Sequence, residues 1–149
     1  SNNIKAYGLK YAKKYNIPFK IYRSDNQNYF ERNSLAELRK RKIKFLCLAG
    51  FIKILSKNFI DNFRYEIVNI HPSLLPKFKG LDAHKKVLKN KEKYTGCTVH
   101  YVTPELDSGS IILQKKIFVK KNETENSLRE RVLEHEHKLY PQAIRLVFK

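Results

Sequence analysis

Residues 68–84 read VNIHPSLLPKFKGLDAH, and this stretch decides the fold prediction. It begins with the end of a short apolar strand, which stops at Pro72 because proline has no backbone donor. Alternation along a strand turns the side chains of Asn69 and His71 to the same face. Both residues are therefore expected at the carboxyl end of a strand, where open α/β sheets bind their ligands.

A second polar stretch follows another predicted strand. Residues 104–109 read PELDSG and come directly after the strand expected over residues 96–102. A carboxylate from this loop, Asp107, can reach an imidazole at the end of the first strand. An amide, an imidazole and a carboxylate form a set suited to proton transfer and to stabilisation of an oxyanion. The two stretches together predict an active site made of Asn69, His71 and Asp107.

The rest of the chain alternates predicted helices with predicted strands. Helices are expected over residues 4–15, 28–42, 57–63, 83–89 and from 124 or 127 to Pro141, and strands over residues 17–22, 43–49, 67–71, 96–102 and 111–119. The apolar run over 43–49 indicates a strand that is buried on both faces, and Pro141 should kink or end the last helix. This order predicts one α/β domain over residues 1–149, with a mostly parallel sheet flanked by helices.

The 149 residues carry a formal charge of +17. Nucleic-acid binding would explain such a charge. The lysines, however, are scattered from Lys5 to Lys149 and form no single block, which favours a general compositional bias. A nucleic-acid partner is therefore not expected, although a basic surface would steer an anionic small substrate towards the protein.

Cys47 and Cys97 both lie inside apolar, strand-like runs. This setting is typical of small buried core residues. Neither cysteine has metal-ligand spacing with another Cys or His, and His135 and His137 diverge on a helix, so no metal site is expected. Two reduced thiols and the absence of a long apolar stretch in the sequence indicate a cytoplasmic protein without a membrane span.

Four segments of the sequence carry a family resemblance. They read LAGFIKILS over residues 48–56, NIHPSLLPKFKGLDAH over 69–84, GCTVHYVTPELDSGSIILQ over 96–114 and EHEHKLYP over 134–141. Together they resemble glycinamide ribonucleotide formyltransferase of purine biosynthesis, and the likeness extends over nearly the whole chain. It implies a Rossmann-like formyltransferase fold, as a monomer or homodimer. It also implies transfer of a formyl group from 10-formyltetrahydrofolate, the co-substrate, to the amine of glycinamide ribonucleotide.

The resemblance implies a role for each of the three polar residues. His71 matches the family's catalytic histidine, which as an imidazolium donates to the oxyanion and protonates the leaving folate nitrogen. Asn69 matches an asparagine that donates to the same formyl oxygen. Asp107 matches an aspartate whose negative charge favours the imidazolium form of His71. Thr98 is expected near the His71–Asp107 pair, while His84 and His100 have only supporting or structural roles.

The resemblance also implies two binding regions. The residues expected to bind the folate are Ile52, Lys53, Ile54, Leu55, Asn69, Val102 and Asp107. Lys53 stands where the family commonly has Arg, and because the two are not equivalent, a weaker contact with the folate carboxylate is expected. The ribonucleotide is expected against Gly50, Pro72 and Glu136.

One part of the family pattern is not found in these residues. The family opens with a strand and a glycine-rich loop that holds the substrate phosphate, and the five glycines, at positions 8, 50, 80, 96 and 109, form no such loop. The domain is therefore expected to be N-terminally incomplete, to have an exposed sheet edge or a gap, and to bind folate better than ribonucleotide.

Several other functions are compatible with the sequence. The high charge would suit methionyl-tRNA formyltransferase, and formyltetrahydrofolate hydrolase shares the same core. The pairing of HPSLLP with GLDAH fits the ribonucleotide enzyme better. An inactive fragment and a basic nucleic-acid-binding domain are the remaining alternatives.

Overall fold

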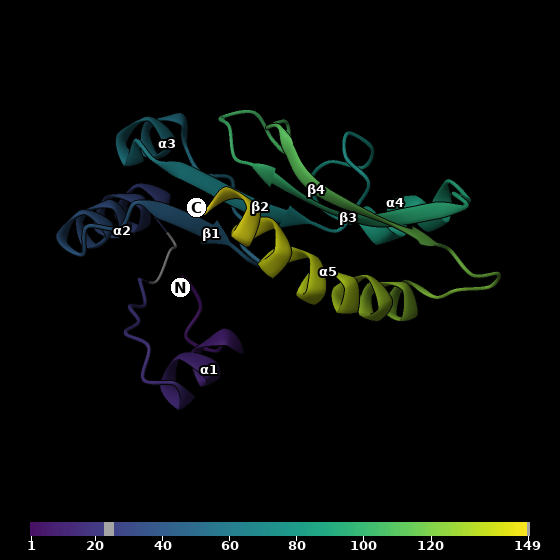
Figure 1. Cartoon of the computed structure of the whole chain (residues 1–149), viewed down its shortest axis with the longest axis horizontal. Helices are drawn as coiled ribbons and strands as arrows, with labels where there is room; N and C mark the ends of the chain where they lie inside the picture. The colour runs from purple at the N-terminus through teal and green to yellow at the C-terminus, as the bar shows by residue number, and fades with distance from the viewer. Residues whose placement is uncertain (23–25, 149) are drawn as a thin grey trace.

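The computed structural model describes residues 1–22 and 26–148. Its elements in chain order are α1 (Gly8–Lys14), α2 (Gln27–Lys40), β1 (Phe45–Leu48), α3 (Lys57–Phe63), β2 (Glu66–His71), α4 (Ala83–Lys89), β3 (Tyr94–Tyr101), β4 (Ile111–Phe118) and α5 (Glu125–Val147). The strands form one sheet in the order β1-β2-β3-β4, and helices flank it (Figure 1). The predicted Rossmann-like α/β class is confirmed.

The direction of the strands differs from the prediction of a mostly parallel sheet. Among the strands of residues 1–22 and 26–148, only β1 and β2 pair in parallel, whereas β2–β3 and β3–β4 are antiparallel. Residues 102–110 join β3 to β4 without a helix. A short connection of this kind reverses the chain and gives an antiparallel pair, since a parallel pair needs a long crossover.

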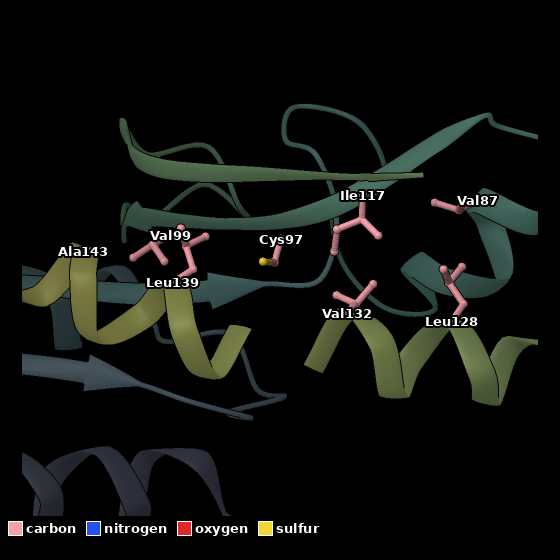
Figure 2. Close-up of a cluster of buried hydrophobic side chains, with 8 residues drawn as sticks. All are labelled: Val87, Cys97, Val99, Ile117, Leu128, Val132, Leu139 and Ala143. Carbon is pink, nitrogen blue, oxygen red and sulfur yellow. The ribbon is translucent and has the colours of Figure 1, made fainter. Parts of the chain in front are cut away.

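Two hydrophobic clusters lie on opposite faces of the sheet. Ile67 of β2 packs with Leu35, Leu55, Phe59 and Phe63 from α2, α3 and the segment before α3. On the other face, one side of α5 packs on β3, β4 and α4 (Figure 2). The members of this second cluster are Val87, Cys97, Val99, Ile117, Leu128, Val132, Leu139 and Ala143. On α5, Leu128, Val132 and Leu139 lie on one buried side, whereas His135 is half-buried.

Side-chain caps mark the starts of α3 and α5. The Ser56 hydroxyl accepts from the Phe59 N–H at 3.1 Å, and the Thr124 hydroxyl accepts from the Ser127 N–H at 3.2 Å. Asp82 occupies the residue before α4, but it has φ +58° and its side chain makes no capping bond. The other helices begin or end within a few residues of the expected positions.

Two predictions about the N-terminal third are wrong. Residues 17–22 form no strand, because their backbone pairs with no strand of the sheet and Tyr22 bonds instead to Ser1. The strand β1 is only half-buried, and its Cys47 is exposed. Among the described strands β1 lies at an edge of the sheet, so it lacks the two-sided cover of a central strand.

Pro141 does not end the last helix, which runs on to Val147. Proline removes the donor that would bond to the carbonyl of His137, four residues earlier. Both Pro141 and His137 are exposed, so water can bond to that carbonyl. Within residues 1–22 and 26–148, no helix combines the length and hydrophobicity needed to cross a bilayer.

Candidate active site

The carboxyl end of β2 opens into a cleft of about 730 Å³. Every residue that the sequence assigned to catalysis or binding lines it. These residues are Gly50, Ile52, Lys53, Ile54, Leu55, Asn69, His71, Pro72, Val102, Asp107 and Glu136. The structure therefore brings both predicted regions together in one place.

His71 is the last residue of β2 and is only 6% exposed. Its Nε2 lies 2.9 Å from the carbonyl oxygen of Phe78, so the N–H at this position donates a hydrogen bond to that oxygen. Its Nδ1 lies 3.2 Å from Oδ2 of Asp107, the approach expected of a second N–H towards a carboxylate. An oxygen atom therefore faces each ring nitrogen of His71.

Asp107 is held in place by backbone as well as by charge. Its Oδ2 accepts from the N–H of Gly80 at 2.8 Å, and its side chain is 9% exposed. Asp107 has φ +45° and Phe78 has φ +58°, so two residues that contact or hold His71 lie in the left-handed region. Such strained conformations persist only where the surroundings impose them, and they gather at functional sites.

The loop that carries Asp107 depends on a close approach at Gly109. A Cβ atom at this position would lie 1.8 Å from the carbonyl oxygen of Tyr101. No side chain fits there, so the loop can lie this close to the end of β3 only because residue 109 is a glycine. This contact fixes where the loop returns to β4 and hence where Asp107 lies.

Asn69 faces His100 across the β2–β3 pair, where the two are register partners. Nδ1 of His100 lies 2.8 Å from the Tyr101 carbonyl oxygen and therefore donates to it. Burial lowers the pKa of His100, which keeps the ring neutral and leaves a lone pair on Nε2. The Asn69 amide donates to this lone pair at 3.4 Å, which directs its NH₂ group into the site.

His100 thus lies closer to the chemistry than the supporting role expected from the sequence. Besides its contact with Asn69, its Nε2 lies 3.6 Å from Oδ1 of Asp107. It is 2% exposed and lies next to both the amide and the carboxylate. Only the pairing of β2 with β3 reveals this, because the two strands are far apart in sequence.

Thr98 is the register partner of His71, so it lies beside the pair as expected. Its hydroxyl donates to the carbonyl of Ser73 at 2.6 Å and accepts from the N–H of Leu75 at 3.1 Å. The Gln114 amide donates both to Thr98 Oγ1 at 2.8 Å and to the Leu75 carbonyl at 3.0 Å. Thr98 therefore holds the loop after His71 against the sheet, through bonds to this loop and to Gln114.

One wall of the cleft is apolar and open to solvent. Ile52 is 75% exposed, Ile54 54% and Leu106 44%. Gly50, with φ +63°, turns the chain at the base of this wall. Exposed aliphatic side chains beside a polar centre are typical of a slot for a planar or apolar ligand.

The opposite wall comes from α4 and α5 and is polar. Burial raises the pKa of Glu136 and lowers that of His84. Nδ1 of His84 is buried without a hydrogen-bond partner among the described residues. Arg129 and Glu125, paired at 2.7 Å, complete this wall. His84, for which the sequence predicts a supporting or structural role, thus lines the cleft. No sequence signal pointed to Arg129 and Glu125.

An imidazole, an oriented amide and a buried carboxylate can act together on one oxygen and one proton. The two N–H donors can stabilise an oxyanion. A carboxylate beside an imidazole favours positive charge on the ring. In the described part of the chain, no three His, Cys, Asp or Glu side chains are grouped as metal ligands.

Known proteins match this chain along almost its full length. Residues 1–144 match a family model described as "Formyl transferase". The chain is 37% identical over 147 residues to "Phosphoribosylglycinamide formyltransferase" of Escherichia coli (strain K12). This match covers 97% of this chain and 69% of that protein. It is 42% identical over 152 residues to "Trifunctional purine biosynthetic protein adenosine-3" of Gallus gallus. That match covers 99% of this chain but only 15% of the trifunctional protein.

Solved structures agree with these matches. The phosphoribosylglycinamide formyltransferase of Anaplasma phagocytophilum has a TM-score of 0.92 and 41% identity, over 99% of this chain and 71% of that one. Glycinamide ribonucleotide transformylase 1 of Symbiobacterium toebii has a TM-score of 0.93 and 37% identity, over 98% and 70% of the two chains.

Proposed function

We propose that this chain, which belongs to the formyl transferase family, transfers a formyl group from 10-formyltetrahydrofolate to the amine of glycinamide ribonucleotide. The observation that carries the proposal is the convergence of Asn69, His71 and Asp107 in one cleft. Their arrangement suits an acyl transfer in which the acceptor is itself the nucleophile. No Ser or Cys nucleophile is then required.

The reaction proceeds through a tetrahedral intermediate. The amine nitrogen attacks the formyl carbon, a new C–N bond forms, and the formyl oxygen becomes an oxyanion. The Asn69 amide and the His71 imidazolium donate hydrogen bonds to this oxygen. The C–N bond to the folate then breaks. The folate nitrogen gains one proton while the amine loses one, so the overall transfer needs no net acid or base.

His71 is well placed to supply that proton but not yet free to do so. Phe78 O accepts from Nε2 and Asp107 from Nδ1. A developing oxyanion is a stronger acceptor than a neutral carbonyl, so it can displace Phe78 as the partner. Asp107 then keeps the imidazole charged until the proton moves, and it can hold a water that takes the amine proton.

The two walls of the cleft divide the ligands between them. The apolar wall from Ile52 to Leu55 and the loop from Val102 to Asp107 suit the folate ring system. Gly50, Pro72 and Glu136 suit the ribonucleotide, with Glu136 accepting from ribose hydroxyls. Lys53 offers a single ammonium where Arg would offer a planar, bidentate group, which predicts a weak contact with the folate carboxylate.

We further propose a cytoplasmic location and a monomeric or homodimeric state. Cys47 and Cys97 are both free thiols, which is usual in a reducing compartment. Neither proposal affects the chemistry.

A test with three acceptor conditions separates this function from its alternatives. The chain is incubated with 10-formyltetrahydrofolate and either glycinamide ribonucleotide, methionyl-tRNA or no acceptor. Formylated ribonucleotide and tetrahydrofolate are expected in equal amounts, and only in the first mixture. Formylation of the tRNA, release of formate without an acceptor, or no reaction at all would each overturn the proposal.

A further inference from the structure

The end of the β3–β4 hairpin carries two exposed aromatic rings and lies away from the cleft. Tyr94 begins β3 and Phe118 ends β4, and the two are register partners. Their ring centroids lie 5.8 Å apart at 74°. Tyr94 is 44% exposed and Phe118 57%. Ile117, which precedes Phe118 on β4, packs into the α5 cluster. Because side chains alternate along a strand, Phe118 and its partner Tyr94 point to the sheet face opposite α5.

Lysines flank these rings along the chain. Nζ of Lys116 lies 3.8 Å from the centre of the Tyr94 ring. The backbone bond from Val119 N to Lys93 O holds the two neighbouring turns together at 3.0 Å. The name hairpin patch is used here for Tyr94, Phe118 and the exposed lysines at the end of α4, on the hairpin end and in the adjoining turns. These lysines are Lys89, Lys91, Lys93, Lys116, Lys120 and Lys121.

The acidic residues within these turns are already paired with cations. Glu92 accepts from Lys77 at 2.9 Å, and Glu123 accepts from Arg131 at 2.6 Å. They therefore do little to neutralise the six lysines. The net charge of +17 looks evenly spread along the sequence. Folding brings some of its lysines together at the hairpin end.

We propose that the hairpin patch binds single-stranded nucleic acid. Flexible strands expose bases that stack on aromatic rings, while their phosphates attract lysines. The patch offers both kinds of contact, with the rings on two paired strands and most of the lysines in the adjoining turns. A duplex hides its bases and could use only the lysines, and an acidic peptide has no bases to stack. This activity is separate from formyl transfer and does not depend on it.

Fluorescence anisotropy with a labelled oligouridylate RNA tests the proposal. Phe118→Ser removes one stacking surface and is expected to weaken binding by about tenfold, within the range for one stacked base. The double variant Lys116→Gln/Lys120→Gln should reduce the slope of log affinity against log salt by about 1.4, since each phosphate contact on a single strand contributes about 0.7. Circular dichroism melts show that each variant is folded.

The matched control removes the same charge from α1. Lys13→Gln/Lys14→Gln should leave the affinity nearly unchanged, because α1 lies far from the hairpin end (Figure 1). An equal loss in this control would show diffuse attraction to the whole surface and overturn the proposal. So would unchanged binding by Phe118→Ser, equal affinity for duplex RNA, or equally strong competition by polyglutamate.

Discussion

The cleft and the helix α1 differ in how many contacts hold them to the rest of the protein. The cleft is held by contacts between distant parts of the chain, such as Thr98 to Ser73 and Asp107 to Gly80. None of the residues of α1 is buried, and Tyr7, Tyr11 and Tyr15 are between 51% and 66% exposed. Figure 1 places α1 below β1 and α2, away from the β3–β4 hairpin.

This difference shows where the geometry of the site originates. The backbone bonds of Ser1 to Lys20 and Tyr22 join the N-terminal segment to itself. The reacting groups are positioned by β2, β3 and the loops that follow them. Changes in the cleft should therefore alter catalysis and stability strongly, whereas changes in α1 should alter them little.

The largest effect is expected from His71→Ala. Loss of a general acid that also stabilises an oxyanion should lower kcat by about 10² to 10⁴-fold. Tyr11→Ser, on α1, should change kcat by less than about twofold, since an exposed side chain outside the site is removed. Steady-state formyl transfer measures both. If the two variants lost similar activity, the distinction between the regions would fail.

Two glycines give the next comparison. Gly109→Ala places a Cβ 1.8 Å from Tyr101 O, which forces the Asp107 loop to move. We expect a loss of stability of about 1–3 kcal/mol, the usual range for overpacking, together with reduced kcat. Gly8→Ala meets nothing within 4 Å and should change stability by no more than about 1 kcal/mol. Urea unfolding compares them, and a stable, active Gly109→Ala would contradict the account.

What the sequence could predict follows the same division. Asn69 and His71 could be placed because alternation within a single strand is a local property. His100 could not, because its role depends on which residue of β2 lies opposite it. The failed strand over residues 17–22 and the exposure of Cys47 have the same origin. Both depend on the neighbours of a strand, which local periodicity does not report.

Two buried threonines on β3 test the support beneath the His71 loop. Thr98→Val leaves the buried Leu75 N–H and Ser73 carbonyl without this partner and should cost about 1–3 kcal/mol. The Oγ1 of Thr95 is also buried but has no partner among the described residues. Thr95→Val should therefore be neutral or stabilising. Thermal or urea unfolding decides, and equal losses for the two variants would remove Thr98 from its supporting role.

The smallest effect is a dependence of stability on pH through His100. Burial lowers the pKa of this ring below its ordinary value of 6.5. Between the two pKa values, His100 is therefore protonated in the unfolded chain but neutral in the folded chain. The stabilising contribution is complete above about pH 6.5 and is lost as the pH falls towards the lower, folded value, by at most about 1.4 kcal/mol per pH unit. His100→Asn should show a shallower acid dependence in urea unfolding, and an unchanged dependence would contradict the assignment.

A double-mutant cycle on His71 and Asp107 tests the central claim most directly. Asp107→Asn should lower kcat by about 10²-fold or more in the otherwise unchanged chain, because the imidazolium loses its counter-charge. In the His71→Ala background the same change should cost less than about twofold, since Asp107 acts through His71. Equal fold losses in the two backgrounds would show that the residues act independently and would contradict the proposed site.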